Sequence, residues 1–135
     1  MISAAITEVA GASSVFDRGF VTYSNAAKTR MLGVPVELID THGAVSEPVA
    51  RRMAKGALDQ SGADIAISVT GIAGPGGSEF KPEGRVCFGL ATKDGTPHVE
   101  TVDFGAIGRA NVRSKTVAHA LDLIVKACKH DLPIS

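Results

Sequence analysis

The sequence has 135 residues, which suits one domain and is short for two. Hydrophobic residues make up 44% of it and charged residues 21%, and 14 basic side chains balance 14 acidic ones to zero net charge. From its length we predict a single domain over 1–135. A neutral chain with 4% aromatic residues lacks the basic face and the stacking rings of nucleic-acid-binding proteins, so we predict no nucleic-acid partner.

Residues 2–9 are expected to form a short helix, because Ile2, Ile6 and Val9 fall on one helical face. A loop follows, and aromatic and β-branched residues favour a strand over the second half of 15–23. Ser24 or Asn25 can cap the next helix, which we expect to end at Gly33.

Two further helices are predicted over 36–42 and 47–60. The second begins at a strong start signal, Ser46-Glu47-Pro48. Ser46 can accept a hydrogen bond from free backbone N–H groups, Glu47 suits the positive helix end, and proline is tolerated in a first turn.

The second half of the sequence predicts strands and one long helix. Residues 63–70 are typical of a strand covered on both faces, and the strands 86–92 and 98–104 are expected to form a hairpin around 93–96. The helix expected over 107–129 carries an apolar stripe: Val112, Thr116, Ala120, Leu123 and Ala127. The order of elements predicts a three-layer α/β/α domain with a mixed sheet.

No membrane segment, metal site or cofactor is expected. No apolar run approaches the ~20 residues of a transmembrane helix, and the first residues lack the pattern of a signal peptide, so we predict a cytoplasmic protein with no membrane partner. Cys87 and Cys128 form no CxxC pair and are interpreted as reduced and buried. The four histidines are scattered without acidic neighbours at metal-ligand spacing.

A glycine-rich loop follows the predicted strand directly, with the sequence Gly-Ile-Ala-Gly-Pro-Gly-Gly at 71–77. Glycines let the backbone approach a ligand and direct N–H groups at an anion, and ligands of open α/β sheets bind outside the carboxyl ends of strands. The loop matches neither the Walker A pattern nor GxGxxG. We interpret it as ligand-binding, with a flexible connection as the alternative.

Two other groups of residues are candidates for chemistry. Tyr23, Asn25 and Lys28 bring a phenol, a carboxamide and an amine to a predicted strand-to-helix junction, and a buried lysine can act as a base. The alternative is a solvated lysine beside a core tyrosine. Arg109 and Arg113 lie four residues apart at the start of the last helix, where they either hold a phosphate or carboxylate or form a solvated face.

Taken together, three motifs resemble the CinA C-terminal domain family. They are Gly-Phe-Val-Thr-Tyr-Ser-Asn at 19–25 followed by Lys28, His-Gly-Ala-Val-Ser-Glu-Pro-Val at 42–49, and Thr-Gly-Ile-Ala-Gly-Pro-Gly-Gly at 70–77. Lys81-Pro82 with Gly84, then Arg109 and Arg113, continue the match, which covers essentially the whole chain. The resemblance implies a nicotinamide-nucleotide amidase, which hydrolyses the carboxamide of nicotinamide mononucleotide to nicotinate mononucleotide and ammonia in pyridine-nucleotide recycling. It also implies a small-molecule nucleotide as partner and a homo-oligomer.

The same resemblance implies roles for individual residues. Lys28 matches a lysine that activates a serine nucleophile, and Tyr23 matches a tyrosine beside it. Arg109 matches a substrate-binding arginine. The remaining residues expected to bind substrate are Asn25, Thr70, Gly71, Ala73, Gly74, Gly76 and Arg113. A neutral lysine amine can take a serine proton, and backbone N–H groups can stabilise a tetrahedral oxyanion.

The sequence departs from the family at the nucleophile. The family motif Glu-Ser-Cys-Thr-Gly-Gly is absent, residues 1–6 align with the helix that follows it, and no serine at 3, 13, 14 or 24 takes its place. We therefore expect this chain to be a weak or inactive amidase. The alternative is a non-catalytic nucleotide-binding or interaction module, which would keep Arg109 and the glycine loop but need no nucleophile.

Overall fold

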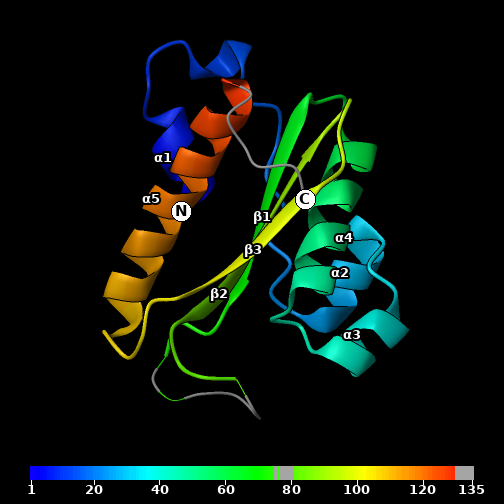
Figure 1. Cartoon of the computed structure of the whole chain (residues 1–135). Helices are drawn as coiled ribbons and strands as arrows, with labels where there is room; N and C mark the ends of the chain where they lie inside the picture. Colours follow the sequence, from blue (N-terminus) through cyan, green and yellow to red (C-terminus); the bar gives the residue numbers. More distant parts are fainter. Residues whose placement is uncertain (75, 77–80, 130–135) are drawn as a thin grey trace.

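The computed structural model describes residues 1–74, 76 and 81–129, in which helices cover both faces of a central sheet (Figure 1). On one face lie α1 and α5, and on the other lie α2, α3 and α4, so the predicted three-layer α/β/α architecture is confirmed. The elements in chain order are α1 (Ile2–Thr7), the 3-10 turn η1 (Ala12–Ser14), α2 (Asn25–Leu32), α3 (Val36–His42), α4 (Glu47–Gln60), β1 (Ile65–Gly71), β2 (Arg85–Thr92), β3 (His98–Asp103) and α5 (Arg109–Cys128).

The sheet has the strand order β1-β2-β3, and both pairings are antiparallel. Ile65 pairs with Thr92 and Gly71 with Val86, while Leu90 pairs with His98 across the predicted hairpin. The expected mixed sheet is therefore not found in the part of the chain that is described. The reason lies in the connections, because each strand returns directly beside its predecessor without the crossover that parallel pairing needs.

The strand predicted over the second half of 15–23 is absent. Residues 16–23 have no helix or strand assignment, and the side chains of Val21 and Tyr23 are 85% and 89% exposed. β propensity reflects packing against neighbouring strands, and in the described structure this segment hydrogen-bonds to none of the three. The composition of 16–23 therefore favours a strand, but none of the described strands pairs with this segment.

The helix ends follow local chemistry in α2 but not fully in α4. Ser24 Oγ accepts a hydrogen bond from Ala27 N at 3.0 Å, and Gly33 ends α2 with φ of 69°. In α4 the expected Ser46 cap is wrong, because Ser46 Oγ instead donates to the carbonyl of Gly43 at 2.8 Å. The hydroxyl thus closes the turn that precedes the helix.

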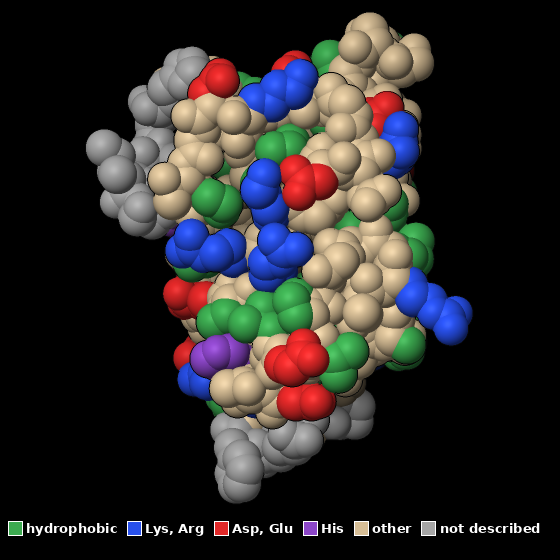
Figure 2. All heavy atoms as spheres, turned by 90° about the vertical axis from the view of Figure 1, so that its right-hand side faces the viewer, with side chains coloured by type: hydrophobic (Ala, Val, Ile, Leu, Met, Phe, Trp, Pro, Cys, Tyr) green, Lys and Arg blue, Asp and Glu red, His purple; other side chains and the backbone are tan. Residues whose placement is uncertain are grey.

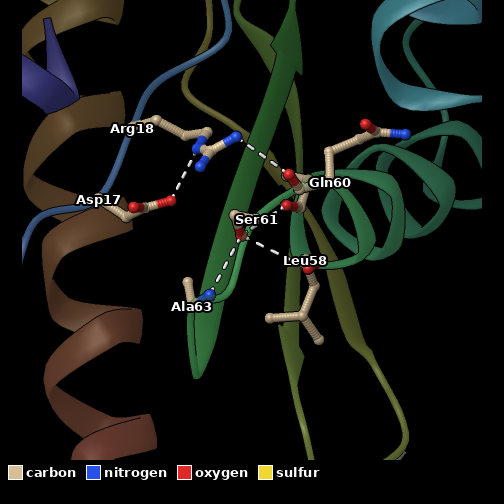
Figure 3. A network of polar contacts seen from close by, with 7 residues as sticks. Asp17, Arg18, Leu58, Gln60, Ser61 and Ala63 are labelled. Atoms are coloured by element: carbon tan, nitrogen blue, oxygen red, sulfur yellow. Dashed lines mark hydrogen bonds and ion pairs between the residues drawn. The ribbon is translucent and has the colours of Figure 1, made fainter.

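The far end of α4 is held by Arg18 (Figure 3). Its Nη1 donates to the carbonyl of Gln60 at 3.0 Å, and its Nε pairs with Asp17 at 2.7 Å. Ser61 Oγ donates to Ala57 O at 2.8 Å and accepts from Ala63 N at 3.3 Å. These contacts satisfy terminal carbonyls of the helix and attach the irregular 16–23 segment to it.

One apolar cluster lies between the sheet and α5, and a second lies within the α2–α4 layer. Beneath α5 the cluster comprises Val86, Phe88, Leu90, Val112, Ala120, Leu123 and Ala127. The second cluster comprises Leu32, Val34, Ile39, Val49 and Met53. The predicted stripe of α5 is confirmed as core, with Thr116 half-buried. Cys87 is buried as expected, but Cys128 is exposed at the last turn of α5, which corrects its prediction.

The outer face of the α2–α4 layer is charged (Figure 2). Lys and Arg side chains gather across the middle of this view, with acidic side chains around them. Arg52 Nη2 donates to Gly33 O at 3.1 Å, and Lys55 pairs with Asp59 at 3.1 Å along α4. The Arg52 contact therefore links α4 to the end of α2, while the exposed Lys55–Asp59 pair contributes little to stability.

Candidate functional site

The glycine loop leaves the end of β1 on a backbone frame that the sheet keeps fixed. Ile72 N donates to Arg85 O at 2.9 Å, and Gly84 N donates to Ile72 O at 2.7 Å. Beyond this frame, Gly74 and Gly76 have φ of 104° and 78°, values that favour glycine. The chain therefore turns sharply at Gly74 and Gly76, and ligand binding by the loop stays a prediction; Pro75 and Gly77 of the predicted motif lie outside the described residues.

A cavity of about 250 Å³ lies beside this loop, between the sheet and α5. Its lining consists of Met1, Ile2, Val69, Gly71, Ala73, Val86, Val112, Arg113, Thr116 and Val117. Three predicted substrate-binding residues, Gly71, Ala73 and Arg113, therefore meet at one cavity. Most of the wall is apolar, and Arg113 supplies one guanidinium that can attract an anion.

Arg109 does not line the cavity. It is exposed at the first residue of α5, one turn before Arg113 on the same side of the helix. Neither arginine forms an ion pair with any residue that the structure describes. Among the described residues, both guanidinium groups are therefore without an ionic partner.

Lys28 is buried in α2, which overturns its interpretation as a solvated residue. Lys28 is 7% exposed, and its Nζ donates a hydrogen bond to the carbonyl of Thr22 at 3.0 Å. Burial lowers the pKa of the Lys28 amine below its ordinary value, because the charged form loses hydration. The amine is therefore closer to a neutral base than a surface lysine is.

The other residues of the predicted junction are placed differently. Tyr23 is 89% exposed rather than in the core, and no described hydrogen bond joins its hydroxyl to Lys28. Asn25 is exposed in the first turn of α2, where its carbonyl accepts from Thr29 Oγ1 at 3.3 Å. The predicted Tyr–Lys pair is not assembled in this structure.

Thr70 lies on the opposite face of β1 from the cavity. It is buried, and its Oγ1 donates to the carbonyl of Ala44 at 2.8 Å, on the side of the α2–α4 layer. Strand alternation explains this, because Val69 and Gly71 then face α5. The structure thus divides the predicted site: Gly71, Ala73 and Arg113 lie on the α5 side, and Thr70 and Lys28 on the α4 side.

No serine of the described chain hydrogen-bonds to the Lys28 amine. Ser24 Oγ is used as the α2 cap, and Ser14 Oγ donates to Gly11 O at 2.7 Å. The expectation that serines 3, 13, 14 and 24 do not replace the family nucleophile stays a prediction.

The apolar wall of the cavity was not among the predicted site residues. Val69 and Val112 were predicted only as members of a buried strand and a helix stripe, and Thr116 and Val117 follow one turn further along α5. Hydrophobic periodicity identifies the buried face of a helix, but it does not indicate that the first turns of α5 border a cavity. The nearby glycine loop was the available signal.

Replacing Lys28 with methionine is expected to stabilise the domain by about 1 kcal/mol at pH 7, because an uncharged chain of similar length then occupies the buried position. The lowered pKa means that the folded state binds fewer protons than the unfolded state in the interval below the unfolded value of about 10.4. Wild-type stability should therefore rise with pH through that interval, toward the variant. Urea unfolding across pH measures this, and identical pH slopes in both proteins would contradict the burial of a charged amine.

Two searches of the described residues gave no candidate. No group of three His, Cys, Asp or Glu side chains is placed to hold a metal ion within this part of the chain. None of the helices found there is both long and apolar enough to cross a membrane.

Comparison with known proteins places the chain in a family. The family described as the CinA C-terminal domain matches residues 1–128. A putative competence-damage inducible protein of Caldicellulosiruptor bescii is 54% identical over 123 residues, which cover 90% of this chain and 29% of that protein. The nicotinamide-nucleotide amidohydrolase PncC of Enterobacter agglomerans is 59% identical over 96 residues, which cover 70% of this chain and 58% of that protein.

The solved structures agree with this placement. The competence/damage inducible protein CihA of Agrobacterium tumefaciens superposes with a TM-score of 0.89 at 49% identity, covering 92% of this chain and 76% of that one. The chain spans less than a third of the Caldicellulosiruptor protein and a little over half of PncC. The match over nearly all of its own length shows that this chain belongs to the CinA C-terminal domain family.

Proposed function

We propose that this domain binds nicotinamide mononucleotide and takes part in hydrolysis of its carboxamide. The observation that carries the proposal is the buried Lys28 amine with its lowered pKa, in a chain 59% identical over its matched part to a nicotinamide-nucleotide amidohydrolase. Such an amine suits a general base, because it can take a proton without first having to lose one.

The cavity supports the binding half of the proposal. Arg113 would hold the phosphate by charge-assisted hydrogen bonds, with Arg109 one turn away to share it. The valine side chains of the wall would contact apolar parts of the ribose, and the carboxamide would extend to the carboxyl end of β1, because Lys28 lies on the α4 side of the sheet. Gly71 and Ala73 bring the loop backbone to the same space, where N–H groups can stabilise developing negative charge on an amide oxygen.

The reaction itself needs a nucleophilic oxygen at the carboxamide carbon. Lys28 would take its proton as the carbon–oxygen bond forms, and the tetrahedral intermediate would then expel ammonia after the amide nitrogen gains a proton. The described residues offer Lys28 no hydroxyl partner. We therefore expect this chain to bind the nucleotide and to release ammonia slowly or not at all.

Arg113→Ala is expected to weaken binding of nicotinamide mononucleotide about tenfold, since a charge-assisted hydrogen bond to phosphate is lost. Calorimetry measures the dissociation constant, with Lys115→Ala as a control that removes an equal charge from an exposed position of the same helix. Equal binding by Arg113→Ala and wild type would contradict the assignment of the cavity.

The second candidate is a non-catalytic nucleotide-binding or interaction module, favoured by the absence of a hydroxyl at Lys28 among the described residues. An ammonia assay beside the calorimetry separates the two. Binding without ammonia release, under conditions where PncC turns over, favours the module, and release at the PncC rate favours the amidase. The cytoplasmic location and the homo-oligomer stay predictions, of which light scattering tests the second.

A further inference from the structure

The cavity beside α5 has two lining residues with polar side chains, Arg113 and Thr116. They lie three residues apart on the same face of the helix, a spacing that places Cβ atoms about 5–6 Å apart. On the sheet side of the cavity, β1 and β2 present the apolar side chains of Val69 and Val86. Polar side-chain contacts to a ligand therefore come from this one face of α5.

The hydroxyl proton of Thr116 is already used within the helix. Thr116 Oγ1 donates to the carbonyl of Val112 at 2.7 Å, one turn earlier in α5. A hydroxyl has one proton to donate and two lone pairs that accept, so toward the cavity Thr116 Oγ1 is an acceptor. Thr116 is half-buried, which limits the competition of water for these lone pairs. Its hydroxyl therefore suits a ligand group that carries a proton, and it offers no donor to a phosphate oxygen.

Arg113 has the opposite hydrogen-bonding capacity. A guanidinium only donates, and that of Arg113 forms no ion pair with any residue in the described part of the chain. The two side chains thus offer donors for an anion and, one turn further along α5, an acceptor for a hydroxyl. A sugar phosphate fits this pair, because it carries a phosphate and ring hydroxyls in one small molecule.

We propose that Thr116 is a specificity-determining residue, which accepts a hydrogen bond from a ribose hydroxyl of the nucleotide whose phosphate Arg113 holds. The inference rests on the proposed function for the identity of that nucleotide. The carboxamide also carries N–H donors, but it must reach Lys28 on the α4 side of the sheet, whereas Thr116 lines the cavity on the α5 side. The ribose lies between the phosphate and the pyridine ring, so its hydroxyls are the donors left for Thr116.

The alternative role for the Thr116 hydroxyl is local, because threonine side chains in helices also bond the carbonyl four residues earlier where no ligand is involved. The two roles differ on replacement by valine, which keeps the β-branched shape and the apolar contacts but removes the acceptor. Serine keeps the acceptor and removes only the methyl group. A ligand-binding hydroxyl predicts weaker binding with valine and recovery with serine, and a local hydroxyl predicts unchanged binding with both.

The test compares wild type, Thr116→Val and Thr116→Ser by calorimetry with nicotinamide mononucleotide, ribose 5-phosphate and inorganic phosphate. We expect Thr116→Val to bind both sugar phosphates about fivefold more weakly than wild type, since one hydrogen bond is lost. Thr116→Ser should bind them as wild type does, and inorganic phosphate, which has no sugar, should bind all three proteins equally. Thr7→Val is the matched control, because it removes a hydroxyl with the same helical contact, 2.8 Å to Ser3 O, from an exposed residue outside the cavity lining.

Three results overturn the role of Thr116 while the nucleotide still binds to wild type, which leaves the proposed function standing. They are unchanged nucleotide binding by Thr116→Val, an equal loss for inorganic phosphate, and no recovery with Thr116→Ser. Weaker ribose 5-phosphate binding by Thr116→Val, in a protein that does not bind the nucleotide, supports the role of Thr116 and refutes the proposed function instead. A wild type that binds none of the three probes overturns both.

Discussion

Gly56→Ala is expected to destabilise the domain by about 3 kcal/mol, although the same change in an open helix stabilises by roughly 1 kcal/mol. Gly56 is buried in α4, and a Cβ there would lie 1.8 Å from Leu32 O and 2.7 Å from Leu32 C. These are backbone atoms at the end of α2, so no side chain can move aside. The two helices would have to separate, which opens the cluster formed by Leu32, Val34 and Val49.

Urea unfolding measures the effect, and Gly62→Ala is the matched control. At Gly62 nothing lies within 4 Å of a Cβ, so we expect a change within about 0.5 kcal/mol. If Gly56→Ala were as stable as wild type, the close crossing of α2 and α4 would be wrong. That crossing also fixes the helix that carries Lys28.

The helices and the hairpin could be predicted because their signals are local. Gly33 ends α2 in a left-handed conformation, and Pro48 suits the first turn of α4, whatever the rest of the chain does. The predicted bounds 36–42 agree with α3. The apolar stripe of α5 could be predicted equally well, because one face of a long helix in a globular domain packs against the core.

The errors arose where the outcome depends on distant residues. Composition at 16–23 favours a strand, but a strand exists only with a partner. Tyr23 is exposed and Lys28 is buried, the reverse of the alternative interpretation of a solvated lysine beside a core tyrosine, because burial depends on how α2 packs rather than on residue type.

The candidate site was predictable in its parts and not in its assembly. The glycine loop and Arg113 were identified from their residues, but strand alternation turns Thr70 away from the cavity that Gly71 lines.

Glu100→Ala is expected to lower the free energy of unfolding by about 3 kcal/mol, because Glu100 joins two histidines across an interface between layers. His98 Nε2 lies 2.7 Å from Glu100 Oε1, and His119 Nε2 lies 2.7 Å from Oε2. An ionised carboxylate only accepts hydrogen bonds, so both histidines carry a proton on Nε2. Since His119 belongs to α5 and the other two to β3, the cluster ties the helix to the sheet edge.

Removal of the carboxylate leaves both imidazole N–H groups without their acceptor. The side chains of His98 and His119 are only 11% and 27% exposed, so water replaces the lost hydrogen bonds poorly. The ring of His119 also packs against Phe88, with centroids 4.4 Å apart, which holds it near the empty position. The cost is therefore that of unsatisfied donors in a packed interface.

The pH dependence gives a second readout with a defined sign. Burial raises the Glu100 pKa, but the hydrogen bonds from His98 and His119 together lower it by more than burial raises it. The net pKa is therefore below the ordinary value. A carboxylate with a lowered folded pKa contributes stability above its unfolded pKa of about 4.3 and loses it as pH falls through the folded value. The difference in the free energy of unfolding between wild type and Glu100→Ala should thus be unaffected by the Glu100 titration from pH 5 upward and should shrink in stronger acid.

Two variants separate the charge from the shape of the side chain. Glu100→Gln keeps the volume and one acceptor, so its loss should be about 1 kcal/mol, and its pH dependence should lack the acid step. Asp122→Ala, which removes an exposed partner of Lys126 on α5, should change stability by less than about 0.5 kcal/mol. Thermal unfolding of the three variants orders them, and equal losses from Glu100→Ala and Asp122→Ala would show that the His–Glu–His contact does not hold α5 to the sheet.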